Sequence, residues 1–227
     1  MSLIEISNIK KIYTKGKVQV KALDGVSLTF NEGEFSSLAG PSGSGKTTLL
    51  NLIGGIDSAD SGSICLKGLD LTGMSSSELA ELRLHDIGFV FQAYNLIPVL
   101  SAVENVEYVL RLRGMKKSEY RERAMDMLDD VGLADMADRR PAELSGGQQQ
   151  RVAVARAIVG EPALVLADEP TANLDSKTGE SLLELMGKMN SDKGVTFIFS
   201  THDKMVMDFA KRLIILKDGH VESDNTK

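Results

Sequence analysis

The sequence has little of three things: it contains one cysteine, no tryptophan and no long apolar run. Cys65 has no second cysteine to pair with, so an intrachain disulfide is excluded and a reducing compartment is the simplest setting. We expect Cys65 to be a buried strand residue. The longest apolar runs, such as residues 163–167, are far shorter than the roughly 20 residues that cross a bilayer, and residues 1–8 do not resemble a secretory signal. These absences predict a soluble, cytoplasmic protein.

Basic residues are outnumbered by acidic ones. The formal net charge is -6, from 26 Lys and Arg against 32 Asp and Glu. Because proteins that bind nucleic-acid backbones gather Lys and Arg on one surface, this balance predicts no nucleic-acid partner. The segment Asn-Lys-x-Asp, by which GTPases read guanine, is also missing. The 227 residues are enough for one α/β domain with a sizeable core.

What the sequence does contain is a glycine-rich segment, residues 40–48, that fits the pattern G-x-x-x-x-G-K-[ST]. Glycines let backbone N–H groups face a phosphate, Lys46 adds a cation, and Thr47 offers a hydroxyl to Mg²⁺. A helix expected over residues 48–56 points its positive dipole end at the same anion. The predicted phosphate-binding residues are Gly40, Ser42, Gly43, Ser44, Gly45, Lys46, Thr47 and Thr48.

The residues before this loop read as short antiparallel strands at 3–6 and 26–30, followed by a strand at 35–39 that enters the loop. Tyr13 is either an aromatic platform for a nucleotide base or an ordinary strand tyrosine with a solvated hydroxyl. Further strands are predicted at residues 63–67, 87–91, 163–167 and 195–199, with a closing hairpin over 212–222.

Helices are expected between and after these strands. The capping-box pattern S-x-x-E at Ser75 and at Ser101 marks two helix starts. Residues 101–159 have a helical pattern and predict a helical subdomain. Within it, Ser145 is placed to cap a helix whose first N–H groups are left bare by Gly146 and Gly147, which makes a second anion site. Spacing leaves open whether this site reaches the nucleotide of the same chain or that of another copy.

Polar residues follow three of the apolar strands. Asp168 and Glu169 end strand 163–167, where open α/β sheets bind their ligands. Asp168 suits indirect coordination of Mg²⁺, and Glu169 suits polarising an attacking water. Gln92 is either a contact for Mg²⁺ or water, or a strand-end hydrogen bonder. His202 follows strand 195–199 and is predicted to reach the same edge of the sheet, whereas His85 and His220 are expected on the surface.

Taken together, these motifs resemble the nucleotide-binding subunit of ABC transporters over nearly the whole chain. The resemblance implies an α/β fold, with a P-loop NTPase (RecA-like) core, an N-terminal antiparallel β subdomain and an inserted α-helical subdomain. It implies a single domain over 1–227, in which 1–92 and 160–227 form the β subdomain and core, and 93–159 form the helical subdomain.

The resemblance also implies the ligands ATP and Mg²⁺ and a head-to-tail homodimer. In that dimer each ATP lies between the Lys46 loop of one chain and the start of the 145–159 helix of the other. The helix residues implied to contact ATP are Ser145, Gly146, Gly147 and Gln148. Tyr13 would stack on adenine, Gln92 would sense Mg²⁺ and a membrane partner, and His202 would contact the γ-phosphate. The implied catalytic residues are Lys46, Gln92, Glu169 and His202, and the implied metal-binding residues are Thr47, Gln92 and Asp168.

Within ABC ATPases, residues 88–98 and 144–151 are similar to the branch that contains lipoprotein-releasing, macrolide-efflux and FtsE-like ATPases. The expected function is ATP hydrolysis that drives an integral-membrane permease at the inner face of the cytoplasmic membrane. The alternative is a signalling or scaffolding module that regulates an extracytoplasmic enzyme through a membrane partner. One departure from the family pattern is Ala172-Asn173, where many members have Ser-Ala.

Overall fold

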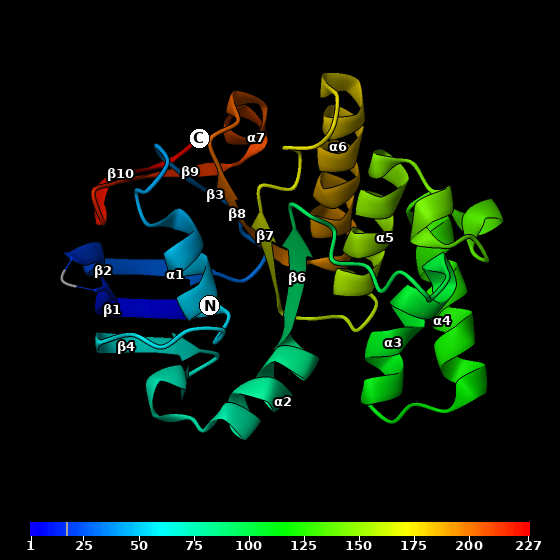
Figure 1. Ribbon diagram of the computed structural model, residues 1–227, viewed down its shortest axis with the longest axis horizontal. Coiled ribbons are helices and arrows are strands. Elements are labelled where there is room, and N and C mark those ends of the chain that lie inside the picture. The colour runs from blue at the N-terminus through cyan, green and yellow to red at the C-terminus, as the bar shows by residue number, and fades with distance from the viewer. Residues whose placement is uncertain (17) are drawn as a thin grey trace.

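The computed structural model describes residues 1–16 and 18–227 and contains two sheets flanked by helices (Figure 1). The four-stranded sheet has the order β2-β1-β4-β5, and the six-stranded sheet has the order β10-β9-β3-β8-β7-β6. The strands of the first sheet are β1 (Ser2–Lys15), β2 (Val18–Asn31), β4 (Ser61–Leu66) and β5 (Leu69–Asp70). The strands of the second are β3 (Phe35–Ala39), β6 (Ile87–Phe91), β7 (Leu164–Asp168), β8 (Thr196–Thr201), β9 (Arg212–Lys217) and β10 (His220–Thr226).

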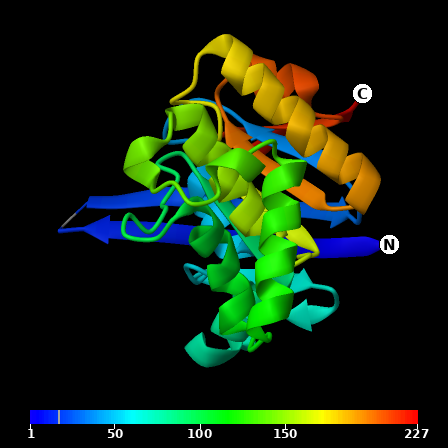
Figure 2. The same ribbon diagram turned by 90° about the vertical axis from the view of Figure 1, so that its right-hand side faces the viewer.

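Helix α1 (Lys46–Ile53) lies between the two sheets, and most of the other helices cover the far side of the larger one (Figures 1 and 2). The α-helices are α1 (Lys46–Ile53), α2 (Ser76–Asp86), α3 (Ala102–Leu112), α4 (Lys117–Asp130), α5 (Gly146–Ile158), α6 (Ser176–Lys193) and α7 (Lys204–Phe209). Short 3₁₀ turns are η1 (Leu71–Gly73), η2 (Ala134–Met136) and η3 (Pro141–Glu143).

The six-stranded sheet separates two hydrophobic cores. Neighbouring strands from β9 through β6 pair in parallel, and β10 pairs antiparallel with β9. Side chains alternate along β7: Leu164 and Leu166 face the core that holds α1, whereas Val165 and Ala167 face the core that holds α3 to α6. Because helices cover both faces, β7 and β8 are buried on both sides, as parallel strands usually are.

The two N-terminal strands are longer than the sequence predicts. The expectation of short separate strands at 3–6 and 26–30 is wrong, because β1 and β2 each run for 14 residues and pair along most of their length. Register shifts interrupt the pairing, one of them between Ile6 and Ile9, where Asn8 has a φ of 50°. Each shift changes which residues face inward, so a single long strand has the sequence pattern of several short ones.

Other differences are smaller. Helix α1 begins at Lys46 and ends at Ile53, so it lies earlier than the predicted 48–56. Cys65 is half-buried rather than buried, because it lies on the face of β4 opposite the buried Ile64 and Leu66. His85 and His220 are exposed, as expected. Among the helices of residues 1–16 and 18–227, none combines the length and the apolar character that crossing a bilayer requires.

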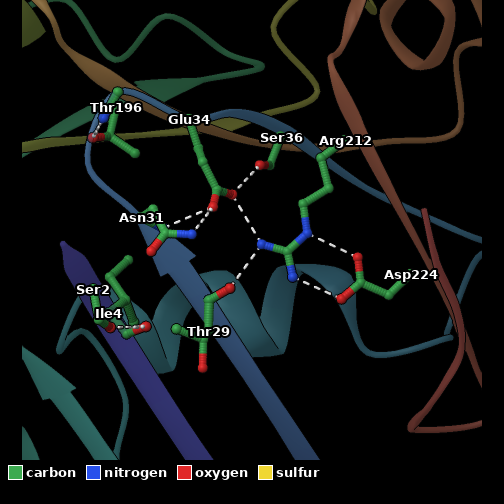
Figure 3. Close-up of polar contacts among 10 residues, drawn as sticks. Ser2, Ile4, Thr29, Asn31, Glu34, Ser36, Thr196, Arg212 and Asp224 are labelled. Carbon is green, nitrogen blue, oxygen red and sulfur yellow. Dashed lines mark hydrogen bonds and ion pairs between the residues drawn. The ribbon is translucent and has the colours of Figure 1, made fainter. Parts of the chain in front are cut away.

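One polar cluster joins the two sheets at the end opposite the glycine-rich loop (Figure 3). Arg212 of β9 donates two hydrogen bonds to the Asp224 carboxylate, at 2.8 and 2.6 Å, and one to Glu34 at 2.9 Å. It also donates to the main-chain oxygen of Thr29 in β2 at 2.7 Å. Burial raises the pKa of Glu34, but the hydrogen bonds from Asn31 and Arg212 outweigh it, so the pKa lies below its usual value.

Candidate nucleotide-binding site

The candidate site lies at the carboxyl ends of three neighbouring parallel strands. β3 leads into the loop at 40–45, β7 ends in Asp168, which Glu169 follows, and β8 ends one residue before His202. Parallel strands bring their carboxyl ends to the same edge of the sheet, where α/β proteins bind ligands. A pocket of about 680 Å³ opens there. Its walls are formed by Tyr13, Val20, Ala22, residues 41–48, Gln92, Glu169 and His202.

The glycine-rich loop has a backbone that a side chain could not follow. Gly40 has a φ of 147°, and a Cβ atom there would overlap the main-chain oxygen of Leu216. Gly45 caps α1 with a φ of 102°, so the first N–H groups of this helix face the pocket. The Ser44 hydroxyl is buried and has no hydrogen-bond partner among the described residues. Bare N–H groups, a free hydroxyl and a helix N-terminus fit a phosphate.

Lys46 and Thr47, in the first turn of α1, carry the functional groups of the loop. The Lys46 ammonium donates to the main-chain oxygens of Gly40 and Pro41 at 2.8 and 3.0 Å, which folds its side chain over the loop. The Thr47 hydroxyl donates to the Asp168 carboxylate at 3.2 Å. A hydroxyl beside a carboxylate, with the Gln92 side chain in the same pocket, is an oxygen donor set of the kind Mg²⁺ prefers.

Glu169 and His202 lie together on the opposite wall. The Nδ1 atom of His202 is 2.7 Å from one oxygen of Glu169, and the Thr201 hydroxyl donates to the other at 3.3 Å. The Glu169 side chain is only 15% exposed, whereas His202 is largely open to the pocket. A carboxylate held in this way can accept a proton from a water molecule that lies in the pocket.

Tyr13 forms the outer wall. Its strand partner is Val20, and the two side chains line the pocket together. The Tyr13 hydroxyl donates to the Asp57 carboxylate at 2.7 Å, and Lys11 bonds the other oxygen of that carboxylate at 2.8 Å. Burial, and next the hydrogen bond to Asp57, raise the pKa of Tyr13 above its usual value. The hydroxyl is therefore bonded, and the ring is available as a wall for a nucleotide base.

The second predicted anion site lies elsewhere in the chain. Ser145 caps α5: its hydroxyl accepts from the N–H of Gln148 at 3.3 Å, and the Gln148 side chain accepts from the N–H of Ser145 at 2.9 Å. Within the described part of the chain, the residues that line the 680 Å³ pocket include none of Ser145, Gly146, Gly147 and Gln148. The structure thus brings together the loop, the carboxylates, Gln92, Tyr13 and His202, but not the start of α5.

Comparison with known proteins identifies the family and the fold. Residues 23–172, more than half of the chain, match the family described as ABC transporter. This chain is a member of that family.

Relatives of the ABC family confirm the assignment over the full length. The chain is 46% identical over 226 residues to the uncharacterized ABC transporter ATP-binding protein MJ0796 of Methanocaldococcus jannaschii, covering 98% of this chain and 96% of that protein. It is 45% identical to the macrolide export ATP-binding/permease protein MacB of Syntrophobacter fumaroxidans, covering 99% of this chain and 32% of that longer protein.

Solved structures agree. The dimeric post-hydrolysis state of the cassette MJ0796 bound to ADP and Pi has a TM-score of 0.91 at 44% identity, covering 98% of both chains. CbiO1 of Clostridium perfringens, described as part of an ABC transporter complex, has a TM-score of 0.89 at 28% identity, covering 99% of this chain and 88% of that one. The predicted P-loop NTPase fold is confirmed, and the chain is an ABC-type ATPase that binds ATP.

Sequence reasoning missed four residues of this ABC cassette that the structure connects to the site. Val20 and Ala22 line the pocket, Asp57 holds Tyr13, and Gln150 bonds the turn after Glu169. Val20 had a usable signal, because residues 18–22 alternate apolar and polar side chains as a strand does. Asp57 had none, since it lies in a turn far from Tyr13 in sequence.

Proposed function

We propose that this ATPase dimerises around two ATP molecules and drives a membrane permease, as an exporter or extruder of the lipoprotein or drug type. One observation carries the proposal: the start of α5, which we predict to bind phosphate, is not part of the pocket formed at the glycine-rich loop. A site that is incomplete in one chain calls for a second copy. The dimeric structures of the relative MJ0796 support this proposal.

The dimer we propose is head-to-tail. A two-fold axis makes the contacts reciprocal, so each chain completes the site of the other. Gly147 lies so close to Thr178 of α6 that a Cβ atom would overlap it, so the first turn of α5 packs against α6 only because this residue has no side chain. In the dimer, Ser145, Gly146, Gly147 and Gln148 would face the nucleotide held by the partner's glycine-rich loop.

The roles of the site residues follow from their chemistry. Glu169 orients the attacking water, and Lys46, His202 and the partner's Ser145 stabilise charge on the transferring phosphoryl group. Tyr13 stacks on adenine. Gly40, Ser42, Gly43, Ser44, Gly45 and Thr48 bind the phosphates through the loop backbone and hydroxyls.

Mg²⁺ fits this site because hydroxyl and carboxylate oxygens lie within reach of the loop. We propose that Thr47, Gln92 and Asp168 hold it, directly or through water. The ion neutralises charge on the phosphates when bound. In residues 1–16 and 18–227, no cluster of three or more His, Cys, Asp or Glu side chains is placed to hold a metal ion. This matches Mg²⁺, which usually takes one or two carboxylates and completes its shell with phosphates and water.

We also propose that residues 93–159 act as the helical subdomain, inserted into a core formed by 1–92 and 160–227. Helix α3 packs on α4 and on α5, which supports the division, and α5 packs in addition on β6 of the core. Gln92 lies at its boundary. The side chain of Asn173 donates to the main-chain oxygen of Gln92 at 2.9 Å. Asn173, which departs from the family pattern, therefore holds the segment at Gln92 against the turn after β7 of the same chain.

The permease is proposed to bind beside Gln92, at the inner face of the cytoplasmic membrane. A depression of about 460 Å³ lies there, with apolar walls that include Phe89, Phe91 and Leu112. Leu112 is 57% exposed and therefore offers this depression an apolar contact for another protein. The relative MacB is named as an ATP-binding and permease protein in one chain, which supports a permease partner.

The dimer is tested with Glu169→Gln. This change keeps the size of the side chain but removes the base, so we expect ATP hydrolysis to fall about a hundredfold or more while ATP binding remains. Light scattering in ATP and Mg²⁺ should then show a stable dimer. Glu122→Gln, at an exposed position on α4, is the matched control and should leave hydrolysis unchanged. A Glu169→Gln chain that stays monomeric would refute the shared site.

The partner is tested by affinity purification from detergent-solubilised membranes of the host. A permease with few spans and a large extracytoplasmic domain would support the exporter or extruder. A many-spanning permease with a solute-binding protein would indicate import instead. An ATP-dependent change in cell-wall hydrolysis without an exported substrate would favour the signalling alternative, and the absence of any membrane protein would overturn the permease proposal.

A further inference from the structure

Three consecutive glutamines in the first turns of α5 have different surroundings. The Gln148 side chain bonds the N–H of Ser145, and the Gln149 side chain donates to the main-chain oxygen of Leu144 at 3.1 Å. Both therefore act within the start of α5 itself. Gln150 is fully buried, and its side chain bonds no group in the first turn of α5.

The Gln150 amide reaches another part of the chain. Its Nε2 atom donates to the main-chain oxygen of Pro170 at 2.8 Å, and its Oε1 atom is buried with no partner among the described residues. A buried amide oxygen without a hydrogen bond is destabilising. An apolar side chain of similar length would avoid this cost, so stability alone does not explain a glutamine at this position.

The turn that Gln150 contacts carries the proposed catalytic base. Glu169 has a φ of 47°, in the left-handed region that residues other than glycine adopt only when their surroundings hold them there. Its N–H donates to the main-chain oxygen of Ser200 at 2.9 Å, and its main-chain oxygen accepts from the N–H of Ala172 at 3.2 Å. The hydrogen bond from Gln150 to Pro170 adds a restraint from α5, outside the strand and its turn.

We propose that Gln150 is a positioning residue for hydrolysis. By fixing the Pro170 carbonyl, it fixes the turn that aims Glu169 at the attacking water. The start of α5 at Ser145 is proposed to contact the ATP held by the partner chain. Through Gln150, the same helix also contacts the turn that carries Glu169 beside the ATP of its own chain. This inference rests on the proposed catalytic role of Glu169.

The test is Gln150→Met, which keeps the length of the side chain and removes the donor. A small displacement of a reacting group can cost up to about a hundredfold in rate, so we expect kcat to fall by about tenfold to a hundredfold. KM for ATP should stay within about twofold, because the phosphate loop is untouched. Losing the hydrogen bond to Pro170 lowers the free energy of unfolding, whereas removing the unpaired Oε1 atom raises it. The melting temperature should therefore stay within about 3 °C of wild type.

Gln149→Met is the matched control, since it makes the same change one residue away and removes a bond to the main chain of Leu144, just before α5. It should leave kcat and KM unchanged. The proposal is wrong if kcat of Gln150→Met lies within twofold of this control. It is also wrong if KM rises as much as kcat falls, or if the variant melts far lower or does not fold, because each result assigns Gln150 a general structural role.

Two further variants separate this inference from the proposed function. If Glu169→Gln alone keeps full ATPase activity, the role proposed for Glu169 fails, whatever Gln150 does. The double variant Glu169→Gln with Gln150→Met should form the ATP-dependent dimer at the same ATP concentration as Glu169→Gln, since Gln150 contacts Pro170 and not the start of α5. Loss of that dimer would place the effect of Gln150 at the shared interface and overturn the inference.

Discussion

Replacing Arg212 by methionine tests how strongly the cluster in Figure 3 holds the two sheets together. The change keeps an unbranched side chain but removes four hydrogen bonds, to the carboxylates of Asp224 and Glu34 and to the main chain of Thr29. The Arg212 and Glu34 side chains are only 15% and 19% exposed, so Glu34 would lose its cation where water reaches it poorly.

The magnitude follows from this burial. Removing one partner of a fully buried ion pair costs about 3–5 kcal/mol. Asp224 is 34% exposed and can be solvated, so the lower end applies, about 3 kcal/mol in the free energy of unfolding. For a chain of this length, each 1 kcal/mol lowers the melting temperature by about 2–4 °C, which gives a loss of about 6–12 °C.

The effect should depend on pH. The hydrogen bonds to Arg212 lower the pKa of Asp224, and that of Glu34 is also lowered. A carboxyl whose pKa is lower in the folded state adds stability above its unfolded pKa, and this stability is lost as pH falls through the folded pKa. The gap between wild type and variant should therefore be full at pH 7 and shrink below about pH 4.

Urea unfolding followed by circular dichroism, at a series of pH values from 7 to 3.5, measures this gap. Arg139→Met, which removes one exposed arginine, is the control and should shift the midpoint little at any pH. A gap below about 1 kcal/mol at pH 7 would refute the argument from burial, since exposed ion pairs contribute about that much. A gap that does not change with pH would refute the role of the two carboxyls.

Three further predictions concern the nucleotide site. Tyr13→Ala should weaken ATP binding about tenfold to a hundredfold, because stacking of a base on an aromatic ring contributes about 1–3 kcal/mol. Tyr13→Phe keeps the ring and should weaken binding less than about threefold. Binding of a fluorescent ATP analogue measures both variants, and equal losses of affinity would contradict stacking. His202→Ala should lower kcat about a hundredfold with little change in KM, measured by phosphate release, and an effect on KM alone would show that His202 serves binding. Thr47→Val should raise the Mg²⁺ concentration needed for half-maximal activity, and an unchanged Mg²⁺ titration would exclude its hydroxyl as a metal contact.

Local signals in the sequence predicted much of the fold. The capping boxes at Ser75 and Ser101 begin α2 and α3, and the strands at 35–39 and 87–91 are β3 and β6 with the same bounds. These elements are predictable because short-range hydrogen bonds and apolar runs determine them. The length of β1 was not predictable, since its register shifts depend on pairing with two other strands.

The candidate site divides in the same way. The loop at 40–48 and the carboxylates at the end of β7 belong to sequence motifs that indicate phosphate and metal binding, and the structure brings them to one pocket. Asp57 and Gln150 act through tertiary contacts, and nothing beside them in sequence shows what they touch. A buried glutamine in an otherwise apolar helix face is a signal only once the burial is known.

The antiparallel edge strand β10 has a consequence for how the protein behaves at high concentration. Because β10 follows a tight turn after β9, the parallel sheet ends there in a strand with the sequence His-Val-Glu-Ser-Asp-Asn-Thr. An open edge invites pairing with the edge of another molecule, and polar or charged side chains on that edge discourage it. β10 is polar at every position but Val221, and Glu222 and Asp224 engage Lys217 and Arg212 of its own neighbour. Pairing of β10 with a sheet edge of another copy is therefore disfavoured even at high protein concentration.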